Sequence, residues 1–140
     1  MTPLLEVRDL KKYFKSRYGT LHAVDGVSFT LDAGKTLGVV GESGCGKTTL
    51  GRTVLHLIEP TDGQIFFEGK DITRPKKKEL RRLREQMQII FQDPYSSLDP
   101  RMTVAELIME PLVLKGGMPK ADMLAETRRL MDTVGLAARF

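Results

Sequence analysis

The feature that most constrains this chain is a glycine-rich stretch at residues 36–50, which reads TLGVVGESGCGKTTL. It contains the pattern G-x-x-x-x-G-K-[ST], formed by Gly41, Gly46, Lys47 and Thr48. An apolar, β-branched run at residues 36–40 precedes the pattern, and apolar residues recur at helical spacing after it. The sequence therefore predicts a strand, a tight loop and then a helix that begins near Lys47.

The chemistry of phosphate binding explains this spacing. Consecutive backbone N–H groups can surround the phosphates of a nucleotide if the chain turns tightly without side chains in the way. Gly41, Gly44 and Gly46 permit that turn. Lys47 can reach the β- and γ-phosphate oxygens, and the hydroxyl of Thr48 can bind a Mg²⁺ that bridges them. The flanking strand and helix patterns argue against a chance lysine beside a glycine-rich hairpin.

Composition limits the class of protein. The chain has 140 residues, 41% of them apolar and 29% charged, which is ordinary for one soluble globular domain. Its single cysteine, Cys45, forms no disulfide framework, so a reducing compartment is expected. We interpret Cys45 as a small filler in the loop because no histidine or acid adjoins it. No apolar run approaches the roughly 20 residues of a membrane span, and the N-terminus lacks a signal-peptide core, so we expect a cytoplasmic protein.

Positive charge is concentrated in one segment. Residues 74–84 contain seven basic residues and one acid, a net charge of +6, which leaves −2 for the rest of the +4 chain. Leu80, Leu83 and Met87 recur at helical spacing, so residues 76–86 are predicted to form a helix with its basic residues outward. Three roles are open for the basic side of this helix. It can be merely solvated, it can contact anionic lipid or a membrane partner, or it can bind nucleic acid. The segment has no aromatic residue.

Before the glycine-rich stretch, residues 4–10 and 27–31 are predicted to pair as antiparallel strands. Between them, residues 11–20 contain Tyr13, Phe14 and Tyr18. A ring here can stack on a purine base or simply pack under the hairpin. Turns are predicted at residues 32–35, 60–63 and 69–71, and a short strand at 64–68. The helix after the loop should stop at Glu59, because Pro60 follows.

The second half is predicted to begin with a buried strand at residues 87–91, followed by Gln92 and a turn-rich stretch at 93–100. Thr103 and Glu106 form a capping box that opens a helix, which Pro111 kinks or ends. A last helix is predicted at residues 120–134 after two glycines, with Gly135 as its C-terminal cap. Its apolar face is predicted to contain Met123, Leu130 and Val134. His22 and His56 have no metal-ligand spacing and are interpreted as structural.

Together, the phosphate loop, Gln92 and the helical segment beyond it resemble the ATP-binding subunit of ABC transporters over essentially the whole chain. Residues 91–111, FQDPYSSLDPRMTVAELIMEP, look like the oligopeptide/dipeptide (peptide/nickel) branch, in which QDP-Y-x-S-L-N-P-R is familiar. Asp99 stands where that branch usually has asparagine. The resemblance implies an α/β fold, namely a P-loop NTPase core of ABC type that is truncated. This core would carry an N-terminal antiparallel β subdomain and the start of the α-helical subdomain. Residues 1–92 would form the core, and residues 93–140 the Q-loop and first helical part.

The resemblance also implies roles for single residues. Tyr13 would stack on adenine, and Val24 would flank the nucleotide. Lys47 and Gln92 would be catalytic, with Gln92 sensing the metal and the attacking water, and Thr48 and Gln92 would bind Mg²⁺. The residues implied to bind ATP are Tyr13, Val24, Gly41, Ser43, Gly44, Cys45, Gly46, Lys47, Thr48 and Thr49.

The implied partners follow from the same resemblance. Residues 93–111 would contact transmembrane permease subunits at the cytoplasmic face of the membrane. A second ABC ATPase subunit would complete a homo- or heterodimer, and an extracytoplasmic solute-binding protein would act indirectly. No nucleic acid is expected as a partner.

Several motifs of the family do not occur in these 140 residues: a signature loop of the LSGGQ kind, four apolar residues running into Asp-Glu, and a downstream histidine. We therefore expect the N-terminal half of a peptide-type ABC ATPase, which binds ATP but does not hydrolyse it alone. Its unpaired strands should make it marginally stable or self-associating. The alternatives are a P-loop kinase, a GTPase, a non-transport ABC protein and an inert interaction fragment. No guanine-selective Asn/Thr-Lys-x-Asp run supports the GTPase.

Overall fold

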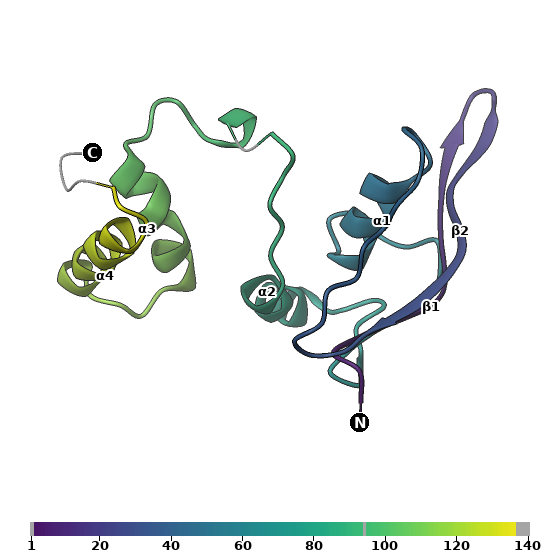
Figure 1. Ribbon diagram of the computed structural model, residues 1–140, viewed down its shortest axis with the longest axis horizontal. Coiled ribbons are helices and arrows are strands. Elements are labelled where there is room, and N and C mark those ends of the chain that lie inside the picture. Colours follow the sequence, from purple (N-terminus) through teal and green to yellow (C-terminus); the bar gives the residue numbers. More distant parts are fainter. Residues whose placement is uncertain (1, 94, 137–140) are drawn as a thin grey trace. The chain divides into compact units, whose positions relative to one another are not determined.

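The computed structural model of the chain describes residues 2–93 and 95–136 (Figure 1). Its contacts divide the chain into two compact units, Met1–Ile89 and Ile90–Phe140. Among the described residues, no helix is both long enough and apolar enough to span a bilayer.

The first unit is built on an antiparallel sheet. Strands β1 (Leu5–Ser16) and β2 (Gly19–Leu31) form a long hairpin, which β3 (Asp62–Phe67) and the short β4 (Lys70–Asp71) extend in the order β2-β1-β3-β4. Leu5 pairs with Leu31, so the predicted pairing of the two N-terminal strands is confirmed. Both strands run further than predicted, and the polar, aromatic stretch between them is the outer half of the hairpin itself.

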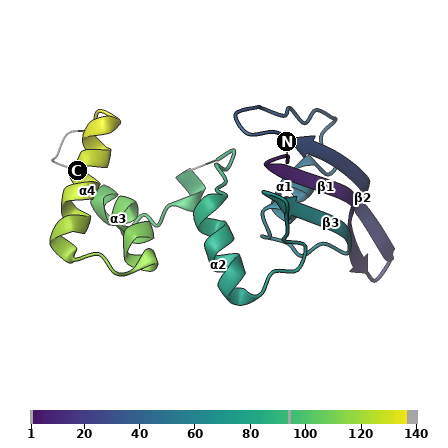
Figure 2. The same ribbon diagram turned by 90° about the horizontal axis from the view of Figure 1, so that it is seen from below.

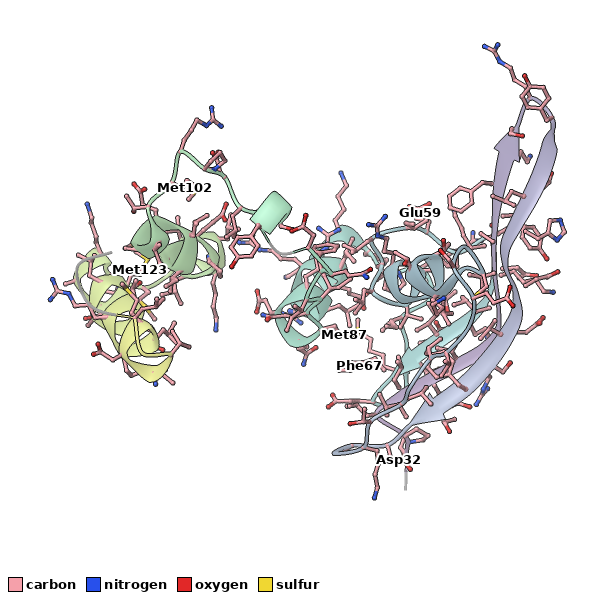
Figure 3. The ribbon with its side chains drawn as sticks, turned by 45° about the horizontal axis from the view of Figure 1, so that its top comes forward. Asp32, Glu59, Phe67, Met87, Met102 and Met123 are labelled. Atoms are coloured by element: carbon pink, nitrogen blue, oxygen red, sulfur yellow. The ribbon has the colours of Figure 1, made fainter. Side chains whose placement is uncertain are left out.

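One face of this sheet carries the core of the first unit. Figure 2 shows helix α1 (Lys47–Val54) lying against the sheet. Phe67 at the end of β3 and Met87 after α2 (Lys77–Gln86), both labelled in Figure 3, are partly buried against the same core. The buried residues come from the sheet, the residue after β4, α1 and α2. The core therefore links the helix that follows the glycine-rich loop to the hairpin. The core residues are Val7, Leu10, Val24, Leu50, Val54, Ile65, Ile72 and Leu83.

Helix α1 ends earlier than the sequence predicts. Its last residue is Val54, whereas the proline rule placed the end at Glu59. His56 adopts a left-handed backbone conformation with φ of 54°, which α-helical hydrogen bonding does not tolerate. The amides of Leu57 and Ile58 both donate to the carbonyl of Arg52, so they close the end of the helix.

Two predicted strands are wrong. Residues 36–40 and 87–91 form no strand, and apart from Met87 their large apolar residues are exposed, Val40 by 95% and Ile90 by 93%. A strand is stable only where a neighbouring strand satisfies its backbone N–H and C=O groups. No strand among the described residues pairs with either segment, so neither segment forms a strand despite its strand-like composition.

The helical predictions are largely confirmed. Helix α2 spans Lys77–Gln86, within one residue of the predicted start. In the second unit, a short 3₁₀ turn η1 (Tyr95–Ser97) precedes α3 (Val104–Lys115). The capping box is present, because Glu106 N–H donates to Thr103 Oγ1 at 3.3 Å and Thr103 N–H donates to Glu106 Oε2 at 2.7 Å. Pro111 does not end the helix, which continues for another turn and loses one backbone hydrogen bond there.

Helix α4 (Lys120–Thr133) packs on α3 and closes as predicted. Gly135 has φ of 75°, and the amide of Leu136 donates to the carbonyl of Met131 at 2.9 Å, as in a glycine C-terminal cap. The predicted apolar face is partly wrong, since Thr127 and Met131 are the buried residues and Val134 is 68% exposed. Thr127 is tolerated inside because its hydroxyl donates to the carbonyl of Met123.

Candidate nucleotide-binding site

The glycine-rich loop joins the unpaired segment before it to the first turn of α1. Gly44 and Gly46 both have positive φ, 81° and 98°, which is strained for any residue with a side chain. Gly46 is also pressed against β2, since a Cβ at that position would lie 2.1 Å from the carbonyl oxygen of Ala23. The glycine at position 46 therefore permits both the turn and the contact with the hairpin.

The side chain of Lys47 turns into this loop. Its Nζ donates hydrogen bonds to the carbonyl oxygens of Gly41 at 2.7 Å and Glu42 at 2.6 Å, and it lies 3.6 Å from Cys45 Sγ. These three residues belong to the loop, so the ammonium group is bound by the loop. The structure therefore brings the Lys47 ammonium group next to the loop that is predicted to hold phosphate, and its contact with phosphate stays a prediction.

The loop also presents unused backbone donors. Within the described residues, the amides of Gly44, Gly46, Lys47 and Thr48 make no hydrogen bond with the protein, and the helix ladder starts only where Leu50 N–H donates to Gly46. The first turn of α1 contains no acidic side chain to compete for these donors. Free amides, a helix N-terminus and an ammonium group form a donor set suited to a polyphosphate.

The two residues predicted to bind Mg²⁺ belong to different units. Thr48 is exposed in the first turn of α1, next to the loop, and Gln92 is exposed in the second unit. The described residues contain no group of three or more His, Cys, Asp or Glu side chains that could hold a metal by themselves. Of the two, Thr48 belongs to the same unit as the loop.

The predicted adenine-stacking residue, Tyr13, takes part in a small cluster on the hairpin. Its ring stacks on His22, with centroids 3.9 Å apart and planes at 20°, and its hydroxyl donates to Asp25 Oδ1 at 2.5 Å. This hydrogen bond raises the pKa of the Tyr13 hydroxyl and lowers the pKa of the Asp25 carboxyl. One face of the ring and its polar end are thus already engaged within the protein.

The register of the hairpin separates Tyr13 from Val24. Val24 pairs with Lys12, whereas Tyr13 pairs with His22, because Ala23 is an extra residue in β2. Cross-strand partners share a face, and successive residues of β1 alternate between faces. Phe14 therefore lies on the same side of the hairpin as Lys12 and the buried Val24, and Tyr13 on the other. The sequence placed Phe14 in the aromatic stretch without giving it a role, because the bulge is not visible there.

A glycine loop of this geometry, followed by a lysine and a hydroxyl residue at the start of a helix, defines a P-loop nucleotide-binding protein. The family model of the ABC transporter matches residues 24–139. The chain therefore belongs to the ABC transporter family, as the sequence motifs predicted.

Several similar proteins are named for peptide transport. A Brucella ovis protein named "Putative peptide import ATP-binding protein" is 51% identical over 135 residues, which cover 96% of this chain and 43% of the relative. The oligopeptide transport ATP-binding protein OppF of Bacillus subtilis is 47% identical over 135 residues, 95% of this chain and 44% of OppF. The predicted resemblance to this branch is confirmed, and the chain spans less than half the length of these relatives.

Solved structures show the same fold. The ATP-binding cassette MJ0796, in a dimeric structure bound to ADP and Pi, matches with a TM-score of 0.80 at 23% identity, over 97% of this chain and 59% of that one. CbiO1 from Clostridium perfringens matches with a TM-score of 0.74 at 25% identity, over 97% and 52%. The predicted ABC-type fold with an antiparallel β subdomain is therefore confirmed.

Proposed function

We propose that this chain is the ATP-binding part of an ABC importer for di- or oligopeptides. The names of its relatives in Bacillus subtilis and Brucella ovis, which specify peptide import or oligopeptide transport, support the class of solute. The observation that carries the proposal is the position of the Lys47 ammonium group inside a loop whose amides have no protein partner. Such a loop attracts the terminal phosphates of a nucleoside triphosphate.

Each part of the loop has a defined task in this proposal. The amides of Gly44, Gly46 and Lys47 donate to phosphate oxygens, and the ammonium group exchanges its two loop carbonyls for phosphate. The hydroxyl of Thr48 would hold Mg²⁺, which would neutralise part of the phosphate charge. Gln92 is proposed to contact the metal and the attacking water.

Calorimetric titration with Mg·ATP tests the proposal. The unsubstituted chain should give a binding heat, and Lys47→Ala should abolish it, since the loop then loses its ammonium group. Lys35→Ala is the matched control, because Lys35 is an exposed lysine in the turn before the loop. Equal heats from all three proteins would refute the role of Lys47, and loss of heat in the control would show that only overall charge matters.

A hairpin ring is proposed to stack on the adenine base, with Tyr13 the residue that the family resemblance indicates. Phe14 is the competing candidate, because it lies on the side of the hairpin where Val24 meets α1, and the residue is 38% exposed. Tyr13→Ala and Phe14→Ala should therefore be compared for affinity towards ATP and inorganic triphosphate. The stacking residue is the one whose loss weakens ATP binding and leaves triphosphate binding unchanged.

The proposed partners follow from the family. Residues 93–111 would contact the membrane-spanning permease at the cytoplasmic face, and an extracytoplasmic solute-binding protein would deliver peptide to that permease. A second ATPase subunit is proposed because the matching MJ0796 structures are described as dimeric. The 140-residue chain by itself is proposed to bind ATP without turnover, since a positioned general base contributes about 10²–10⁴-fold and these residues offer no candidate.

A further inference from the structure

The proposed nucleotide site does not use the most strongly charged surface of the first unit. This surface, here termed the basic face, consists of the exposed basic residues on and just before α2. Leu83 is buried in the core and Leu80 is half-buried, so the helix is fixed to the unit by its apolar side. The basic face comprises Arg74, Lys76, Lys77, Lys78, Arg81, Arg82 and Arg84.

Nearby acids offset little of this charge. The carboxylate of Glu79 is bound to Lys70 Nζ at 2.7 Å, and Lys70 lies outside the basic face, in β4. Within the described residues, no ion pair joins Lys77, Lys78 or Arg82 to an acid. Glu85 is the remaining acid of the helix. Lys77, Lys78 and Arg82 therefore carry positive charges that an anionic partner can neutralise.

Helical spacing brings four of these cations onto one side of α2. Lys77 and Arg81 are one turn apart, as are Lys78 and Arg82, and the apolar positions lie on the opposite side of the helix. Since the apolar residues point into the core, the helix has no free hydrophobic stripe to insert into a bilayer. A partner would be held by charge alone, at the level of its anionic groups.

We propose that the basic face of α2 docks on an anionic lipid surface, with its lysines and arginines at the phosphate groups of the lipids. This assignment rests on the proposed function, which places the chain beside a membrane. Residues 74–86 contain no aromatic side chain to stack on unpaired bases, which favours lipid over single-stranded nucleic acid. A cluster of four to eight basic residues near a bilayer is typical of binding to anionic lipids.

Vesicle sedimentation tests the proposal with the whole 140-residue chain. The protein should bind vesicles containing about 30% phosphatidylglycerol and should not bind pure phosphatidylcholine vesicles. The triple variant Lys77→Gln, Lys78→Gln, Arg82→Gln should lower the partition coefficient by about 100-fold, since each cation near the surface contributes about fivefold. Binding should also fall steeply between about 0.05 and 0.5 M salt, a measurement that needs no variant.

A matched control removes the same number of charges elsewhere. Lys15, Arg17 and Lys35 are exposed residues of the hairpin and of the turn after it, so the triple change to glutamine there lowers net charge equally. This control should retain most of the binding, and both variants should keep the circular dichroism spectrum of the parent. Equal losses in the two triple variants, or no binding of the parent to anionic vesicles, would overturn the proposal.

Two further measurements test whether the basic face binds nucleic acid instead and whether lipid binding is independent of ATP binding. Tighter binding to a short DNA or RNA duplex than to vesicles at the same salt would assign the face to nucleic acid instead. Lys47→Ala should leave vesicle binding unchanged, so failure of ATP binding and failure of lipid binding are distinguishable.

Discussion

Replacing Gly46 by alanine should damage both the fold and the nucleotide site, and Gly44→Ala supplies its control. Both glycines have positive φ, 98° and 81°, so either substitution forces a side chain into left-handed backbone geometry. This strain costs about 1–2 kcal/mol per residue. At Gly46 the new Cβ also lies 2.1 Å from the Ala23 carbonyl oxygen, whereas at Gly44 nothing lies within 4 Å.

The difference between the two variants therefore isolates the contact between the loop and β2. Forcing a methyl group into a packed site typically costs about 1–3 kcal/mol. We expect Gly44→Ala to lower the free energy of unfolding by about 1–2 kcal/mol and Gly46→Ala by about 2–5 kcal/mol, the sum of strain and overlap. The cost is high because the clashing atom is backbone, which cannot rotate away.

Urea unfolding, followed by circular dichroism and analysed by linear extrapolation, measures both values. Mg·ATP calorimetry on the same variants should show a loss of heat for Gly46→Ala, because α1 must move away from the hairpin to relieve the overlap. If the two variants unfold with free energies within about 0.5 kcal/mol of each other, the close approach of Gly46 to Ala23 does not exist and the reasoning fails.

Three further predictions concern the rest of the first unit. Ile65→Ala should lower the free energy of unfolding by about 2–5 kcal/mol, because this core side chain is fully buried, and a loss under about 1 kcal/mol in urea would contradict it. Burial lowers the pKa of His56, and the positive charge of Arg84 lowers it further. Near the ordinary pKa of histidine, His56 therefore binds a proton in the unfolded chain and not in the folded chain. Stability should therefore decrease as pH falls below about 6.5, and His56→Asn should flatten that part of a thermal-unfolding series against pH. The exposed segment at residues 36–40 should promote self-association, which Val40→Lys should reduce in sedimentation velocity, and a monodisperse parent with a sharp, cooperative melt would rule this out.

The candidate site was predictable from sequence where local chemistry decides it. Lys47 lies inside the loop because it follows Gly46 at the start of a helix, and this arrangement needs few contacts beyond the motif. The role of the hairpin rings was not predictable in the same way. Whether Tyr13 or Phe14 shares a face with Val24 depends on one extra residue in β2, and composition gives no sign of that bulge.

The sequence by itself determined the elements whose stabilising groups are close in the chain. The Thr103 capping box, the α4 cap at Gly135 and the phosphate loop all form through hydrogen bonds or backbone conformations within a few residues. Only the tertiary structure decided that residues 36–40 and 87–91 are not strands, since strand formation requires a partner that is distant in sequence. It also decided the burial of Thr127, whose hydroxyl is satisfied by its own helix. Hydrogen bonds between residues close in the chain follow from the local sequence, whereas strand pairing and side-chain burial depend on segments that are distant in the chain.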